Sequence, residues 1–174
     1  MLILGIDPGT ATTGFGLIEF EPQTKKSPKK IRYIDCGVIL TSAKTDHALR
    51  LKEIYEGLVY LIKKHKPDAI SVEKLFFQNN AKTAMTVAQA RGMTILACAN
   101  YNIAYEEFTP NQVKMALTGY GRANKKQIQR MAQLALGLKS IPSPDDEADA
   151  WCAAICLANA YNLKKLLKNT WQRF

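Results

Sequence analysis

Three short apolar runs follow one another in the first forty residues, and this order constrains the fold more than any other feature of the chain. They cover residues 2–6, 14–20 and 31–40, and only a few residues connect each run to the next. Short connections favour antiparallel pairing of neighbouring strands. The sequence therefore predicts three consecutive antiparallel strands, with the lysine-rich segment "EPQTKKSPKK" as a hairpin tip.

The pattern then changes to helices alternating with strands. Helical spacing from about residue 46 to 65 predicts a helix with the inward positions Leu49, Leu51, Ile54, Leu58, Leu61 and Ile62. The segment "DAISVE" predicts a buried strand that ends at Glu73, and "IAYEEF" predicts a further strand. Between these two strands we expect a helix from Asn80 to about Asn100, with inward candidates Ala84, Ala88, Ile95 and Ala99.

Capping signals mark three more helices. Thr109 followed by Pro110 predicts the start of a short helix, and Asn124 predicts the cap of a second one that ends near Gly137. A last, largely buried helix is expected behind Ser143. Strands followed by alternating helices and strands indicate the α/β class, with a mixed five-stranded sheet flanked by helices. The length of 174 residues suits a single domain over 1–174.

The charge balance narrows the classes of partner. There are 24 Lys and Arg residues against 15 Asp and Glu residues, a formal net charge of +9, which favours a polyanion such as nucleic acid. We find neither a signal peptide nor an apolar run long enough to cross a bilayer, so we expect a soluble protein that is not secreted and has no membrane partner. The four cysteines lack metal-site spacing and are expected to be buried, reduced thiols.

Two carboxylates end apolar strands, where an ionised group needs compensation. Asp7 follows the first run and precedes Pro8 and Gly9, and Glu73 ends "DAISVE". If these strands are parallel, their carboxyl ends meet at one edge of the sheet, where open α/β sheets bind ligands. Asp7 could instead begin an Asx turn, and Glu73 could pair with Lys74 or Arg91.

Two further carboxylates lie near the start of the last helix. Asp146 and Asp149 are three positions apart, so they share one helix face. Asp149 stands within an apolar stretch, whereas Asp146 also has the spacing of a capping box with Ser143. Converging carboxylates without histidine suit hard divalent cations, with Mg²⁺ as the first candidate.

Five ordered segments carry a family resemblance: "GIDPGTATTGFG", "VEKLFFQNN", "AQARG", "VKMALTGYGRANKKQIQ" and "DDEADAWCAA". Together they resemble RuvC-type Holliday junction endonucleases over nearly the whole chain. The resemblance implies a ribonuclease H-like fold, a homodimer, and paired symmetric nicking of four-way DNA junctions in recombination and repair. It also implies products with 5′-phosphate and 3′-hydroxyl ends.

The same resemblance assigns site residues. Its acidic tetrad falls on Asp7, Glu73, Asp146 and Asp149, which would hold two Mg²⁺ ions, with Mn²⁺ as an alternative. Residues expected to contact DNA are Phe76, which would stack on unpaired bases, and the cations Lys114, Arg122 and Lys125.

Several alternatives stay open at this point. Phe76 could be a core residue, and Phe77 could compete for the stacking role. Gly119 and Gly121 could serve only a turn between helices. The loop over residues 21–32 is more basic than the family strands suggest, and it is either a solvated hairpin tip or a contact for a junction arm or another protein. The C-terminal tail "KKLLKNTWQRF" is similarly undecided.

Other function classes fit less well. A non-catalytic binder of branched DNA would not need four acids, an actin-like ATPase would need a second lobe, and a ribonuclease H lacks "AQARG" and "TGYGRANKK". We therefore expect a metal-dependent endodeoxyribonuclease. The resemblance further implies action in the cytoplasm together with a branch-migration motor complex.

Overall fold

The structure is a computed structural model that describes residues 1–24, 26–74, 81–139 and 145–166; for 81–83, 145–147 and 162–166 it describes the backbone alone. The strands are β1 (Leu2–Asp7), β2 (Thr12–Glu21), β3 (Lys30–Leu40), β4 (Ala69–Glu73) and β5 (Ala104–Phe108). The helices are α1 (His47–His65), α2 (Ala81–Asn100), α3 (Pro110–Thr118), α4 (Lys125–Leu136) and α5 (Asp145–Leu166). None of these helices has both the length and the apolar character needed to cross a membrane.

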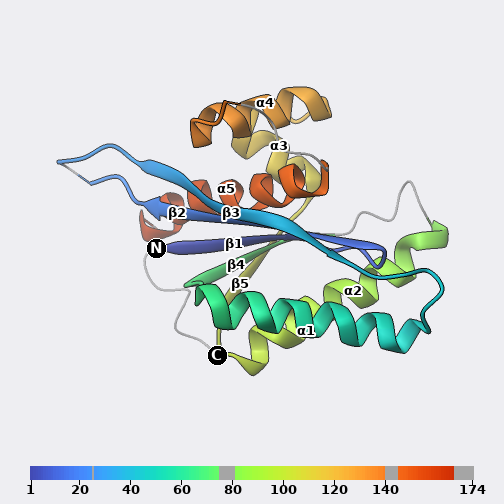
Figure 1. The fold of residues 1–174 in the computed structure, drawn as a ribbon. Coiled ribbons are helices and arrows are strands. Elements are labelled where there is room, and N and C mark those ends of the chain that lie inside the picture. Colours follow the sequence, from blue (N-terminus) through green and yellow to red (C-terminus); the bar gives the residue numbers. More distant parts are fainter. Residues whose placement is uncertain (25, 75–80, 140–144, 167–174) are drawn as a thin grey trace.

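The strands form one mixed sheet in the order β3-β2-β1-β4-β5. The pairs β1–β2 and β2–β3 are antiparallel, whereas β1–β4 and β4–β5 are parallel. Helices α1 and α2 cover one face, and α5 packs on the other face beneath α3 and α4 (Figure 1). The predicted mixed five-stranded sheet and ribonuclease H-like class are confirmed.

Helix ends follow the predicted capping residues where these are described. Thr109 and Asn124 form capping boxes with Gln112 and Gln127 at the starts of α3 and α4, as predicted, and Asp46, which was not predicted as a cap, caps α1. Each box satisfies backbone N–H groups that the helix itself leaves without partners. The predicted caps Asn80 and Ser143 lie outside the described residues.

Two inward assignments were wrong. Leu49 on α1 is 53% exposed, and Ala99 on α2 is also exposed, while Ala90, Ala97 and Cys98 are buried. Helix α2 consists largely of small and apolar residues, so its sequence gives no sharp contrast between two faces. The prediction of buried, free cysteines is confirmed for Cys98, Cys152 and Cys156, whereas Cys36 is free but only half-buried.

Helix α5 lies unusually close to the sheet because two glycines make room for it. Gly5 on β1 and Gly16 on β2 are cross-strand partners. A Cβ atom at Gly5 would lie 2.0 Å from the carbonyl oxygen of Ala150, and one at Gly16 would lie 2.1 Å from Cδ1 of Trp151. The buried Ser71 hydroxyl on β4 also donates a 2.6 Å hydrogen bond to the carbonyl of Ala153. These contacts fix the depth of α5, which carries Asp149.

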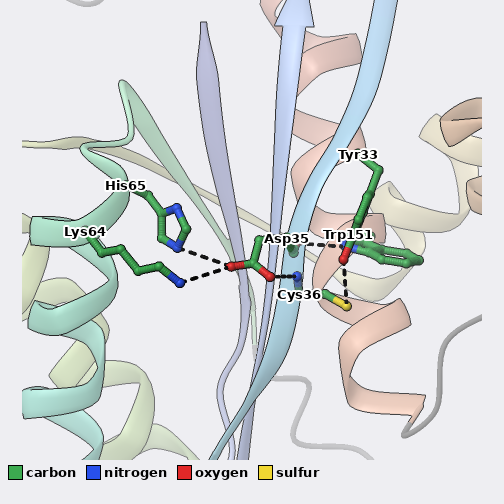
Figure 2. A network of polar contacts seen from close by, with 6 residues as sticks. All are labelled: Tyr33, Asp35, Cys36, Lys64, His65 and Trp151. Atoms are coloured by element: carbon green, nitrogen blue, oxygen red, sulfur yellow. Dashed lines mark hydrogen bonds and ion pairs between the residues drawn. The ribbon is translucent and has the colours of Figure 1, made fainter.

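The edge strand β3 is tied to both helical layers by the Asp35 cluster (Figure 2). Asp35 Oδ2 lies 3.4 Å from both Lys64 Nζ and His65 Nε2 at the end of α1. On the other face, Trp151 Nε1 donates to the Asp35 carbonyl at 3.5 Å, and the ring of Tyr33 meets that of Trp151 edge-on with centroids 5.2 Å apart. Both layers therefore contribute to holding this edge.

The basic segment between β2 and β3 connects the two strands as a hairpin, as predicted; residue 25 is not among the described residues. Thr24 N–H donates to the Ser27 carbonyl. Lys29 Nζ donates a 2.6 Å hydrogen bond to Asn159 Oδ1 on α5, and Arg32 forms ion pairs with Glu19 and Glu21. At least part of this positive charge therefore serves contacts within the chain.

Candidate active site

Asp7 and Glu73 are neighbours because β1 and β4 are parallel and in register. Ile6 lies opposite Val72, so the next residue of each strand brings its carboxylate to the same edge of the sheet. Beyond Asp7 the chain turns at Gly9, where a Cβ would lie 2.3 Å from the Thr12 carbonyl oxygen. The prediction that these two strand-ending acids meet at the carboxyl edge is confirmed.

Asp149 joins them from α5. The seating of that helix on Gly5 and Gly16 brings its N-terminal part to the same end of the sheet. Asp149 Oδ2 lies 2.9 Å from Nζ of Lys125, the first residue of α4. The Asp149 side chain is 28% exposed, so this carboxylate is open to a ligand while it is paired.

Electrostatics link all of these groups to Glu73. Its pKa is raised from an ordinary 4.5 to about 8, chiefly because burial disfavours the charged form and further because Asp7 and Asp149 repel it. Lys125 and Lys114 act in the opposite direction and lower the same pKa. The three carboxylates and two lysines therefore form one electrostatic unit.

The carboxylate oxygens of Asp7, Glu73 and Asp149 are donors that suit a hard cation. In the structure, however, they lie too far apart to coordinate one ion together. Among the described side chains, no group of three His, Cys, Asp or Glu is gathered closely enough to hold a metal ion. The pKa of Glu73 is nevertheless raised by Asp7 and Asp149 in addition to burial, so the three acids are near enough to interact. Oxygen donors with excess negative charge are what Mg²⁺ and similar ions require.

Two predicted residues fall outside what is described. Phe76, and with it its competitor Phe77, has no described position, and Asp146 is described by its backbone alone, on the first turn of α5. The roles assigned to them stay predictions.

The predicted DNA contacts differ in how closely they approach the carboxylates. Lys125 touches Asp149, and Lys114 on α3 is near enough to Glu73 to influence its pKa. Arg122 is exposed in the connection between α3 and α4. Gly119, with φ of 70°, is the C-cap of α3, so the turn alone accounts for that glycine.

One alternative for Glu73 can be removed. Arg91 on α2 forms a bidentate ion pair with Glu107 of β5, in which Nη2 lies 2.7 Å from Oε2. Glu107 is thus a further acid near the sheet edge, but its arginine partner accounts for it.

Sequence reasoning missed two features that position the site. The contact between Lys125 and Asp149 was not foreseen, since Lys125 was assigned to DNA alone. Gly5 and Gly16 were not recognised as the seat of α5, although glycines within two apolar strand segments were a usable signal of close backbone approach.

Comparison with known proteins agrees with this arrangement. The family model described as crossover junction endodeoxyribonuclease RuvC matches residues 3–157. The chain is 46% identical over 170 residues to the protein of that name from Syntrophomonas wolfei, covering 98% of this chain and 95% of the relative.

Two solved RuvC structures have a similar fold. Thermus thermophilus RuvC superposes with a TM-score of 0.86 at 30% identity, covering 94% of this chain and 97% of that one. The T. thermophilus RuvC complex with a Holliday junction substrate gives a TM-score of 0.82 at 28% identity, covering 94% and 96%. With the strand-end carboxylates, the seat of α5 and these matches together, the chain belongs to the RuvC family of crossover junction endodeoxyribonucleases.

Proposed function

We propose that this protein is a metal-dependent endonuclease that resolves four-way DNA junctions by paired symmetric nicks, in homologous recombination and DNA repair. The observation that carries the proposal is the convergence of Asp7, Glu73 and Asp149 from three separate elements onto one sheet edge. Support comes from the family membership and from the similar T. thermophilus RuvC that was solved with a Holliday junction.

Asp7, Glu73 and Asp149 are the proposed metal ligands, with Asp146 as the fourth. Two Mg²⁺ ions are proposed, with Mn²⁺ as a substitute; when bound, such ions activate a water and stabilise the departing 3′ oxygen, leaving a 5′-phosphate. The carboxylates hold the charge in place and do not attack phosphorus. Glu73 would lose its proton when it becomes a ligand, because only the ionised carboxylate is a good donor.

The cations would orient the substrate. Lys125 can exchange Asp149 for a DNA phosphate, since both offer it a charged oxygen, and Lys114 and Arg122 would extend this contact along the backbone. Phe76 is proposed to stack on an unpaired base near the junction centre.

We further propose a single nuclease domain over residues 1–174 that acts as a homodimer. Two sites related by a two-fold axis match the near two-fold symmetry of a four-way junction, which explains paired cuts. From the family resemblance we also propose action in the cytoplasm together with a branch-migration motor complex.

The test offers the protein labelled four-way junctions, linear duplex and an RNA–DNA hybrid, each with Mg²⁺ or EDTA. We expect nicks in two strands of like polarity, in the junction only and with Mg²⁺ only, and no cleavage by Asp7→Asn. Cleavage of the hybrid alone would overturn the proposal, and junction binding without cleavage would identify a non-catalytic binder.

A further inference from the structure

The segment that contains α3 and α4 carries positive charge without any acid. From Thr109 to Pro144 there is no Asp or Glu, and the segment holds six cations: Lys114, Arg122, Lys125, Lys126, Arg130 and Lys139. Elsewhere on the described surface, cations such as Arg32, Lys52, Lys64 and Arg91 are paired with carboxylates. An acid-free stretch of this length creates a local positive potential that favours a polyanion.

Part of this charge lines a groove on α4 that is separate from the carboxylates. The α4 groove, as we name it, has a volume of about 470 Å³ and includes Tyr120, Asn124, Lys126, Gln127, Arg130 and Met131. This is large enough for a sugar-phosphate segment rather than a single ion. Its two cations form no ion pair with any other residue that the structure describes.

The α4 groove lies next to the candidate active site, because adjacent residues of α4 belong to each. Lys125, the first residue of α4, reaches Asp149, while Lys126, the next residue, lines the groove. Arg130 follows one turn later, about 6 Å further along the helix axis at 1.5 Å per residue. A spacing of this order matches neighbouring phosphates along one DNA strand, whose distance along the helical path exceeds the rise of about 3.4 Å per nucleotide.

The chemistry of the groove suits a nucleic-acid backbone. Lys126 and Arg130 offer donors to phosphate oxygens, and the exposed rings and methyl groups of Tyr120 and Met131 offer an apolar surface to the sugars. Continuity with Lys125, which contacts Asp149 from the first turn of α4, favours DNA over an acidic protein.

We infer that the α4 groove binds the phosphate backbone of the junction arm that carries the cut strand, and that Lys126 and Arg130 hold this arm in register with the carboxylates. This inference rests on the proposed function. It adds a contact surface beyond Lys114, Arg122 and Lys125, and its residues position the substrate without touching the reacting phosphate.

The experiment compares two double variants with the same loss of charge. Lys126→Gln with Arg130→Gln removes the groove cations, and Lys52→Gln with Lys63→Gln removes two cations from α1 on the opposite layer (Figure 1). Binding of a labelled four-way junction is measured in EDTA across a salt series, and thermal melting confirms that each variant is folded.

For the groove variant we expect affinity to fall about tenfold and the slope of log affinity against log salt to become shallower by about 2, because two phosphate contacts are lost. Single-turnover cleavage of the saturated complex with Mg²⁺ should also be slower than that of the wild type, because the arm is no longer held in register with the carboxylates. The α1 variant should keep the wild-type slope.

The inference is overturned if the groove variant keeps the wild-type affinity and slope, which would leave the groove to a protein partner, or if both variants lose slope equally, which would indicate net charge alone. Failure of the wild type itself to bind the junction would instead overturn the proposed function.

Discussion

Glu73 is the residue whose environment is most informative. Its carboxyl is brought to the end of β4 beside two other acids, and its pKa rises to about 8. Because the folded state then binds a proton that the unfolded chain releases above pH 4.5, this group lowers the free energy of unfolding as the pH rises from about 4.5 to 8. A chain under selection for stability alone would not keep this arrangement.

Glu73→Gln should therefore stabilise the metal-free protein. In EDTA at pH 8 we expect its free energy of unfolding to exceed that of the wild type by about 1–3 kcal/mol, with a smaller gain at pH 5. Urea unfolding at both pH values measures this, with Glu56→Gln on the exposed side of α1 as the control. An unchanged or lower stability at pH 8 would show that burial and the neighbouring carboxylates do not disfavour the ionised form of Glu73 as described.

The sequence predicts the positions of some site residues but not the contacts of others. Asp7 and Glu73 could be predicted because strand ends and a parallel pairing place them together without further information. The contact of Lys125 with Asp149 could not, because it depends on how α4 and α5 pack, which no local pattern encodes.

At the scale of elements, α5 is positioned by the glycine pair on β1 and β2. Gly5→Ala would place a methyl group 2.0 Å from the Ala150 carbonyl oxygen, so the helix must move. We expect a loss of about 1–3 kcal/mol of stability and a large fall in cleavage, since Asp149 moves with the helix. Chemical unfolding and junction cleavage measure the two effects.

A matched control is Gly92→Ala within α2, where an added Cβ meets no atom within 4 Å. It should raise stability by about 0.5–1 kcal/mol, because alanine is the better helix former. Equal stability of Gly5→Ala and wild type would contradict the close seating of α5.

The Asp35 cluster gives the edge strand β3 a pH-dependent attachment. Burial and the neighbouring Lys64 lower the pKa of His65, and Asp35 raises it in part. The folded protein thus binds a proton at His65 less readily than the unfolded chain, so this group reduces stability as the pH falls through 6.5 and below.

His65→Gln should therefore weaken the loss of stability on acidification. Comparing the free energies of unfolding at pH 7.5 and 5.5, we expect a smaller difference for the variant than for the wild type. A larger difference in the variant would mean that the ion pair with Asp35 outweighs burial.

Over the whole molecule, the fold could be predicted because element order and connection lengths leave few topologies open. Three antiparallel strands followed by alternating helices and strands predict a mixed sheet, and the structure adds the strand order β3-β2-β1-β4-β5. The exposure of individual residues could not be predicted in α2, because small and apolar residues occur on both of its faces; Ala99 is an example. The contacts of α5 with Gly5 and Gly16 and the shape of the α4 groove appear only in three dimensions.

The whole molecule also separates chemistry from affinity. The carboxylates lie at the ends of β1 and β4 and near the start of α5, whereas Lys114, Lys126 and Arg130 lie on α3 and α4, so the two activities should be separable by mutation. Removing one carboxylate leaves the cationic surface intact.

The most direct measurement compares wild type and Asp149→Asn on one labelled four-way junction, with binding in EDTA and single-turnover cleavage in Mg²⁺. We predict that the variant binds within about threefold of wild type and that its cleavage rate falls by at least about 1,000-fold, a loss of about 4 kcal/mol of transition-state stabilisation. Parallel loss of binding and cleavage, or cleavage that survives the substitution, would contradict the account of a carboxylate site that performs chemistry beside a separate DNA-binding surface.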